Sequence, residues 1–255
     1  MSTEKIEKLR SFLLDNIDSM EVDSSGGHYP DSPDFDLYAR DYLNFAEQEL
    51  ALHLEATSDQ ARIRHLTNCV TNLKRAMDCQ LDTFFYAYNL YQIFHKKNLK
   101  FEKKLEFLKA CDIFNSRSLV RLNTLRNSME HSYEVPQIED IEVYCDLVAA
   151  FIAVLQRVIS STTRSEMYIN TGLGKDDTTL HYRDGYLQID YRKEIPEIRI
   201  GWHKYALESQ EEVKEEMTAT MDNPEEFAFF FKVILLMQDL DHYASYGYIY
   251  QQLSS

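Results

Sequence analysis

The stretch VYCDLVAAFIAVLQRVIS, residues 143–160, is strongly apolar. It ends just before the sequence changes from a helical pattern to a strand pattern. Apolar residues cover much of its helical surface, so we expect a central, buried helix over 137–160. Pro136 stands where the first turn of this helix would begin, a position that suits proline because the first N–H groups of a helix have no partner there. The pattern before this helix is helical, and after Thr162 it changes to short runs typical of strands.

The residues that precede this stretch repeat apolar side chains every three or four positions, which predicts helices. We expect a short N-terminal helix, and then helices over 35–55, 58–97, 101–113 and 118–131. A helix of about forty residues is long for a globular domain, so 58–97 should contain a kink or a break. Residues 21–34 hold two glycines and two prolines and are expected to be a linker.

Short runs of aromatic and β-branched residues follow Thr162 and predict an antiparallel sheet of three or four strands. The runs are Met167–Ile169, Leu180–Tyr182, Tyr186–Tyr191 and Ile198–Trp202. Asp184-Gly185 between two of them is typical of a hairpin turn. The acidic segment Glu208–Met217 is expected to be a helix, and Asn223-Pro224 predicts the cap and first residue of another that ends near Leu240.

These patterns predict an α+β protein with three parts. We expect an N-terminal helix and linker over 1–34, an all-α up-down helical bundle over 35–162, and a small antiparallel sheet with helices over 163–255. Hydrophobic residues make up 44% of the 255, enough for a sizeable core. No run reaches the roughly 18–20 consecutive apolar residues of a membrane span.

The N-terminal sequence MSTEKIEKLR is polar and lacks the apolar segment of a signal peptide, so we expect a cytoplasmic protein without a membrane partner. The four cysteines form no Cys-x-x-Cys pair and are interpreted as reduced thiols, most of them in the core. They are Cys69, Cys79, Cys111 and Cys145.

The net charge of -15 is unevenly distributed along the chain. Residues 61–126 hold 13 Lys and Arg against 5 Asp and Glu, so this segment carries +8 and the remainder is strongly acidic. A cationic segment that leads into Arg126 would attract a polyanion locally, whereas the acidic remainder limits non-specific binding of nucleic acid. The alternative is that its densest part, Lys96–Lys104, is only a solvated helix end and loop.

The segment Arg126-Asn127-Ser128-Met129-Glu130-His131-Ser132-Tyr133 combines a fixed cation, an amide, an imidazole and a phenol. Arginine can hold a phosphate with two parallel hydrogen bonds and stays charged, and histidine transfers protons near neutral pH. These groups suffice to cleave a phosphodiester without a metal.

Helical geometry separates two of these groups. At about 100° per residue, Arg126 and His131 diverge by about 140°, too far for one regular helix to direct both at a single phosphate. Either the helix ends between them, or two copies of the motif meet across a two-fold axis. The alternative without function is that Arg126 and Glu130 form a surface ion pair and that His131 is a cation at a helix C-terminus.

The pattern Leu125-Arg126-Asn127-x-x-x-His131-x-Tyr133, followed by a proline-started helix, resembles the signature of the HEPN superfamily. In that signature an Arg, often followed by a polar residue, precedes a His by four to six positions. The subtype is similar to the Arg-x4-His-x-Tyr form of HEPN toxins that are paired with minimal nucleotidyltransferase antitoxins. Asn72-Leu73-x4-Asp78 resembles the second-helix pattern of such proteins. The resemblance covers about residues 35–160.

This resemblance implies a HEPN-like helical bundle that forms a homodimer and acts as a metal-independent endoribonuclease, as a toxin or antiviral defence effector. His131 would be the general acid/base, Arg126 would bind the scissile phosphate, and Asn127 would orient the imidazole or contact the phosphate. Asp78 would be the contribution of the second helix. Tyr133 would contact a base or be the hydroxyl that a nucleotidyltransferase partner modifies.

RNA is the implied substrate, because its 2′-OH supplies the nucleophile. Arg121 is a further candidate for binding this substrate. No cofactor is expected. The alternative function is a HEPN-like module for dimerisation and for binding a nucleotide or protein, without cleavage.

Metal ligands are not predicted. Asp78 and Asp82 lie one turn apart and could hold a metal, but such pairs are more often a solvated helical stripe. The other histidines show no ligand spacing. The C-terminal tyrosines 243, 246, 248 and 250 could stack on bases, although packing on the sheet is the preferred interpretation.

Overall fold

The computed structural model describes residues 2–26, 33–96, 100–115, 117–136, 140–161, 166–171, 185–205, 212–240 and 243–254. It divides the chain into two compact units, one of residues 1–29 and 161–255 and the other of residues 30–160. The second unit has nearly the bounds expected for the helical bundle. The N-terminal segment, which we expected to form a part of its own, belongs to the same unit as the C-terminal residues.

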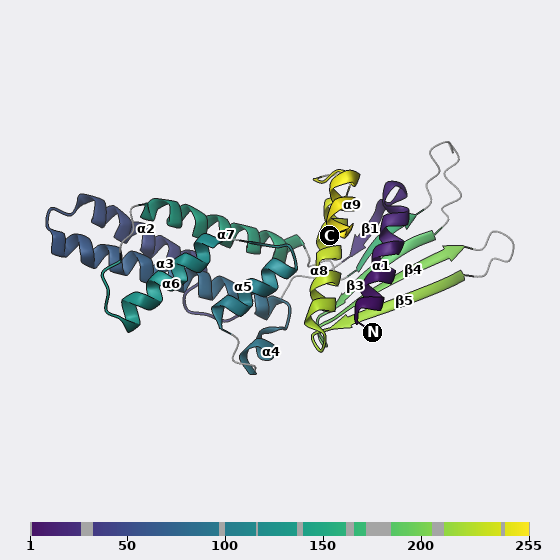
Figure 1. The fold of residues 1–255 in the computed structure, drawn as a ribbon, viewed down its shortest axis with the longest axis horizontal. Coiled ribbons are helices and arrows are strands. Elements are labelled where there is room, and N and C mark those ends of the chain that lie inside the picture. The colour runs from purple at the N-terminus through teal and green to yellow at the C-terminus, as the bar shows by residue number, and fades with distance from the viewer. Residues whose placement is uncertain are drawn as a thin grey trace. The chain divides into compact units, whose positions relative to one another are not determined.

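The helical unit contains six helices among its described residues (Figure 1). They are α2 (Ala39–Glu55), α3 (Asp59–Ala87), α4 (Tyr91–Lys96), α5 (Phe101–Ala110), α6 (Arg117–His131) and α7 (Ile141–Ser161), the last ending at the boundary. Ser58 caps α3 by accepting a hydrogen bond from the N–H of Ala61, at 3.3 Å. The break expected within 58–97 is confirmed, because Asn89 has φ 52 and the N–H of Leu90 donates to the carbonyl of Phe85. This geometry ends a helix with a left-handed residue.

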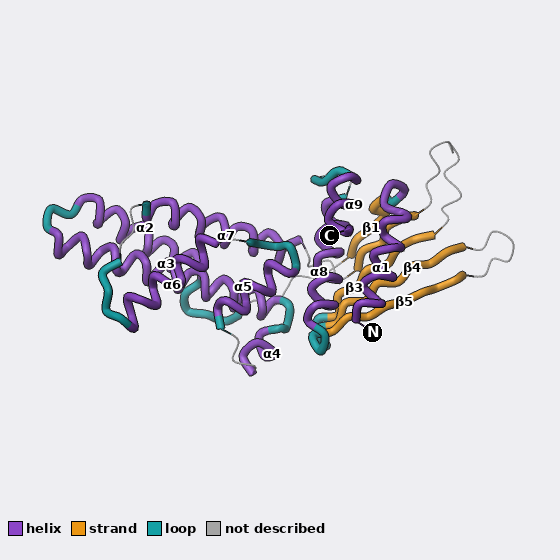
Figure 2. Tube along the Cα trace, in the orientation of Figure 1, coloured by secondary structure: helices purple, strands orange, loops and turns teal. Residues whose placement is uncertain are grey.

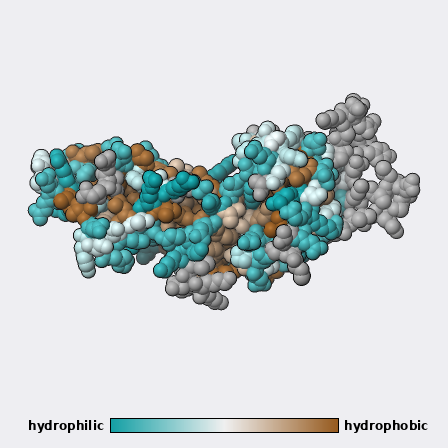
Figure 3. All heavy atoms as spheres, viewed as in Figure 1, coloured by the Kyte–Doolittle hydropathy of each residue, from teal (hydrophilic) through white to brown (hydrophobic). Residues whose placement is uncertain are grey.

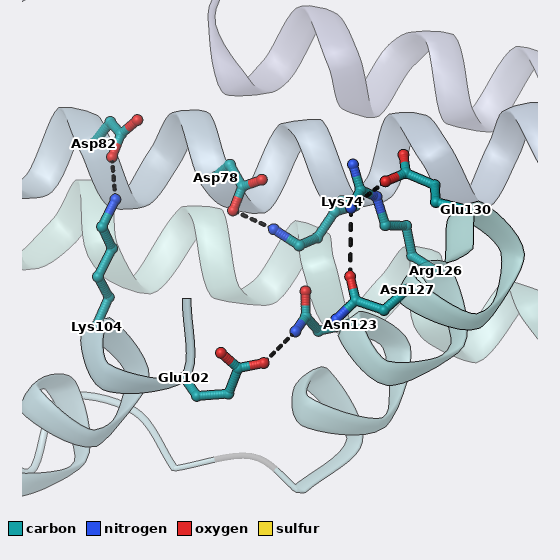
Figure 4. A network of polar contacts seen from close by, with 9 residues as sticks. All are labelled: Lys74, Asp78, Asp82, Glu102, Lys104, Asn123, Arg126, Asn127 and Glu130. Carbon is teal, nitrogen blue, oxygen red and sulfur yellow. Dashed lines mark hydrogen bonds and ion pairs between the residues drawn. The ribbon is translucent and has the colours of Figure 1, made fainter. Parts of the chain in front are cut away.

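The directions of the four long helices of this unit alternate. α2 and α3 form a helical hairpin, and α6 runs antiparallel to α3 (Figure 4). α7 runs parallel to α3, since the Sγ atoms of Cys69 and Cys145 lie 4.0 Å apart and the Tyr88 hydroxyl donates to the carbonyl of Val158. The arrangement is therefore up-down, as expected.

Two expectations about α7 are wrong. The helix begins at Ile141, with the carbonyl of Asp140 accepting from Val143, and Pro136 lies in the preceding loop. Asp140 lies immediately before the first residue of α7, a position that favours aspartate. α7 is also buried on one face only, and Val143 on another face is 60% exposed. The buried residues are Ile141, Cys145, Val148, Phe151, Ile152 and Leu155.

Among the described residues, α7 is the one helix long and apolar enough to cross a membrane by length and composition. The core helix of a soluble protein meets the same test, and the buried face of α7 is compatible with that class. Figure 3 shows apolar side chains at the surface of the helical unit among hydrophilic ones. The four cysteines are free thiols, and three of them are buried.

The other unit, of residues 1–29 and 161–255, which we call the sheet unit, is a two-layer arrangement of helices on an antiparallel sheet (Figure 2). The described strands follow the chain in the order β1 to β5: Glu21–Gly26, Glu166–Thr171, Gly185–Arg192, Glu197–Tyr205 and Glu212–Thr220. The helices are α1 (Ser2–Asn16), which continues into a 3₁₀ turn (Ile17–Ser19), α8 (Pro224–Asp239) and α9 (Tyr246–Ser254).

One face of the sheet carries the core of this unit. Leu187, Ile189, Ile198 and Ile200 alternate with more exposed residues along β3 and β4 and are buried. Trp202 continues this face and stacks on Phe12 of α1, with ring centroids 4.4 Å apart. Phe227, Phe230 and Phe231 of α8 are buried in the same layer.

Two strands come from segments for which we expected something else. β1 lies in the predicted linker and pairs with β2, so that Glu21 is opposite Asn170. β5 overlaps the predicted acidic helix and pairs with β4 along its whole length. In β5 the buried Met217 and Ala219 alternate with Glu216 and Thr218, a period of two that pairing with β4 selects over local helix propensity.

Of the remaining expectations for this unit, one is confirmed, one lies outside the described residues and one is wrong. Asn223 caps α8 by accepting from the N–H of Glu226, at 3.4 Å, as predicted. The run Leu180–Tyr182 and Asp184 of the predicted turn lie outside the described residues. The C-terminal tyrosines do not form the expected strip on the sheet, since α9 contacts α1 and buries Ile249 and Leu253.

Candidate functional site

The helix α6 carries most of the candidate residues and is continuous from Arg117 to His131. Its buried side faces the bundle through Leu119, Leu122 and Asn123. The N–H of Ser132 donates to the carbonyl of Ser128 at 2.9 Å, which closes the last turn. The helix therefore does not end between Arg126 and His131, and the first of the two routes by which one chain could bring them together is wrong.

Arg126 lies on the side of α6 that faces α3 and is bound by its own helix. Its Nη1 is 2.5 Å from a carboxylate oxygen of Glu130 and donates to Oδ1 of Asn127 at 3.3 Å. Its side chain is 29% exposed, and its Nε is buried without a hydrogen-bond partner. The helical angles place Arg126 on a different arc from the core-facing leucines of its helix, which predicts that it faces solvent or a partner. The structure instead makes it part of a network at the helix interface (Figure 4).

Lys74 of α3 is the most buried cation of this network. It is 6% exposed, pairs with Asp78 one turn along the helix, and places Nζ 4.2 Å from the ring centroid of Phe101. Burial lowers the pKa of Lys74, Asp78 opposes that shift, and the charge of Arg126 lowers the pKa further. The influence of Arg126 on this pKa indicates that the two cations are close enough to repel each other.

The network extends along α3 and α5 through two more polar contacts. Lys104 Nζ lies 2.5 Å from Asp82, and Asn123 donates to Glu102 at 2.6 Å. Asn123 is 3% exposed, so its amide bond to Glu102 satisfies a buried polar group. Figure 4 shows these pairs beside Lys74 and Arg126.

The acidic pair Asp78 and Asp82 is therefore engaged by lysines. Each carboxylate has its own cation, which agrees with a polar helical stripe rather than with a metal pair. Among the described residues, no group of three or more His, Cys, Asp or Glu side chains is placed to hold a metal ion.

The remaining candidates lie outside this network. His131 and Arg121 are exposed, and neither side chain has a hydrogen bond or ion pair with any described residue. Tyr133 is 89% exposed and has φ 57, so it lies beyond the end of α6. A continued helix would have placed it about 20° from Arg126, and this expectation is wrong. The structure thus brings together Arg126, Asn127 and Asp78, and leaves the other three apart from them.

Two residues that belong to this description were not predicted as candidates. Lys74 is one, and its signal was its position next to the buried Leu73, where a lysine needs a partner. Arg117 is the other, and its signal was its spacing of four residues from Arg121 on the same helix.

The structure places the guanidinium of Arg126 and the amide of Asn127 at the α3–α6 interface. The imidazole of His131 lies at the end of α6 and contacts no described residue through a hydrogen bond or ion pair. A half-exposed ion pair such as Arg126–Glu130 contributes about 0–1 kcal/mol, so a phosphate can compete with Glu130 at little cost. Comparison with protein-family models, curated proteins and solved structures finds no match for this chain.

Proposed function

We propose that this protein is a metal-independent endoribonuclease that cleaves RNA at a site shared by two copies of the helical unit. The observation that carries the proposal is the geometry of α6, which is unbroken between Arg126 and His131. The two side chains diverge by about 140° on such a helix, so one copy cannot direct both at one linkage. Two copies related by a two-fold axis can supply the guanidinium from one chain and the imidazole from the other.

The reaction needs no protein nucleophile. The 2′-oxygen of a ribose attacks the adjacent phosphorus, the bond to the 5′-oxygen of the next nucleotide breaks, and the products end in a 2′,3′-cyclic phosphate and a 5′-hydroxyl. The imidazole that faces the guanidinium across the dimer accepts the proton of the 2′-OH, and the imidazolium formed in this way then donates a proton to the leaving 5′-oxygen. Arg126, released from Glu130, would stabilise the charge that develops on the phosphate oxygens. Asn127 would orient the phosphate or the imidazole.

The resemblance of the Arg126–Tyr133 motif to HEPN toxins supports a role as a toxin or antiviral effector in the cytoplasm. On this proposal, Tyr133 is accessible to a partner nucleotidyltransferase, because its side chain is almost fully exposed. Induced expression of the wild-type chain should arrest growth, and expression of His131→Ala should not.

The direct test is cleavage of a labelled RNA in EDTA by the full chain, beside Arg126→Ala and His131→Ala. Either substitution should lower the rate by at least about a hundredfold. A mixture of the two inactive variants should regain part of the activity, because a mixed dimer holds one intact pair. Cleavage that survives both substitutions, or a monomer that is active at every concentration, would eliminate this site.

One observation favours the alternative function, a HEPN-like binding module without cleavage. Arg126 is occupied by Glu130 and Asn127 of its own chain. Under this alternative, the dimer should bind a nucleotide or protein ligand but leave every RNA intact.

A further inference from the structure

The outward face of α6 differs from its inward face in charge. Taking Arg126 as zero, five polar side chains fall within an arc of about 80° centred opposite the buried residues. They are Arg117, Arg121, Thr124, Ser128 and His131, which we call the outer stripe. All are exposed except Ser128, which is half-buried. The one carboxylate of α6, Glu130, lies about 100° or more from every member of the stripe.

The arginines of the outer stripe also differ from the cations of the inner interface. Arg117 and Arg121 form no ion pair or hydrogen bond with any described residue. By contrast, Lys74, Lys104 and Arg126 at the inner interface are each neutralised by a carboxylate. The protein as a whole carries a net charge of -15, so two exposed arginines on a helix face without a carboxylate differ in sign from the average charge of the protein.

The spacing of the stripe suits an extended polyanion. Successive members lie three or four residues apart, which is about 4.5–6 Å along the helix, and the stripe extends about 21 Å from Arg117 to His131. Guanidinium groups bind phosphate oxygens, and the hydroxyls of Thr124 and Ser128 can donate to phosphate or ribose. His131 stands at the C-terminal end of this series.

We propose that the outer stripe is the track on which a single-stranded RNA backbone lies, with Arg117 and Arg121 as the anchors that lead the strand to His131. This inference rests on the proposed function for the identity of the ligand. It assigns a role to Arg117 and gives Arg121 a positioning role about 15 Å from the imidazole rather than contact with the scissile phosphate. The strand is recognised through its backbone, so the track itself has no base preference.

The test measures binding separately from cleavage. The full chain with His131→Ala keeps RNA intact, and anisotropy of a labelled single-stranded RNA is measured between 50 and 200 mM salt. The double variant Arg117→Gln/Arg121→Gln is compared with Lys103→Gln/Lys109→Gln, which removes two exposed cations from α5 of the same unit.

The stripe variant should bind about tenfold more weakly, and its log–log salt dependence should be shallower by about 1.4, the loss of two phosphate contacts to a single strand. The control variant should retain the affinity and slope of its parent. An equal loss in both variants, or no loss in either, would overturn the proposal. Selective loss of binding to an acidic peptide, with RNA binding retained, would overturn it as well.

The two proposals fail in different ways. If RNA binds through Arg117 and Arg121 but is never cleaved with His131 restored, the track stands and the endoribonuclease does not. If cleavage depends on His131 while the stripe variant keeps its KM, the enzyme stands and the track does not. If both proposals are correct, the stripe variant with His131 restored should cleave RNA with a raised KM and an unchanged kcat.

Discussion

The guanidinium of Arg126 is bound by the carboxylate of Glu130, one helical turn further along α6, with 2.5 Å between Nη1 and Oε2. Both side chains are partly exposed, so the pair contributes little to stability and yet occupies the face of Arg126 that a phosphate would use. A substrate phosphate that binds Arg126 would have to replace Glu130 in this ion pair.

Glu130→Gln should therefore increase RNA cleavage by lowering KM a few-fold, because the neutral amide competes less with phosphate for Arg126. The free energy of unfolding should change by less than about 1 kcal/mol. Steady-state kinetics and urea unfolding measure the two quantities. Glu106→Gln is the matched control, since Glu106 forms an exposed ion pair with Lys103 on α5. A fall in kcat of Glu130→Gln would show instead that Glu130 orients Arg126.

Lys74→Met should remove a pH dependence of stability. Burial places the pKa of Lys74 below its ordinary value in the folded protein, so the unfolded chain binds more protons once pH exceeds the folded pKa. The wild-type protein should accordingly gain stability relative to Lys74→Met as pH rises from that lowered pKa towards about 10.4. Urea unfolding followed by circular dichroism between pH 7 and 10 measures the difference. A difference that is constant with pH would contradict the shift.

Tyr133→Gly should stabilise the helical unit by about 0.5–1 kcal/mol. Tyr133 has φ 57, a left-handed conformation that costs a residue with a Cβ about 1 kcal/mol and costs glycine nothing. The tyrosine side chain is 89% exposed, so little packing is lost. Thermal unfolding provides the measurement, with Tyr133→Phe as the control that keeps the ring. A loss of stability in the glycine variant would mean that the ring makes a contact which its exposure does not reveal.

Asn223→Ala should destabilise the sheet unit by about 1 kcal/mol, because the N–H of Glu226 loses its cap at the start of α8. The fluorescence of Trp202, the one tryptophan of the chain, reports unfolding of this unit through its stack on Phe12. Gln251→Ala on the exposed side of α9, in the same unit, is the control and should be neutral or slightly stabilising. Equal effects of the two substitutions would argue against a role for the cap.

Local patterns predicted most of the helices, because an apolar period near 3.6 and a cap are properties of a short segment. The cap of α8 at Asn223 belongs to this class. The break within 58–97 was expected from the length of the segment, and only the structure places it at Asn89. The start of α7 was misplaced because both Pro136 and Asp140 are good starting residues, and neighbouring residues alone do not choose between them.

The sequence alone predicted an α+β chain with mainly helices before Thr162 and strands after it, and it left open whether Arg126 and His131 lie on one unbroken helix. Tertiary structure alone decided that β1 joins residues far along the chain, that β5 is a strand, and that Lys74 lies beside Arg126. The reason is physical: periodicity and caps act within a few residues, whereas strand pairing and the burial of a charge depend on groups that only the folded chain brings together. Arg126 and His131 are separated by the same rule, since an unbroken helix directs them to opposite sides whatever their nearness in sequence.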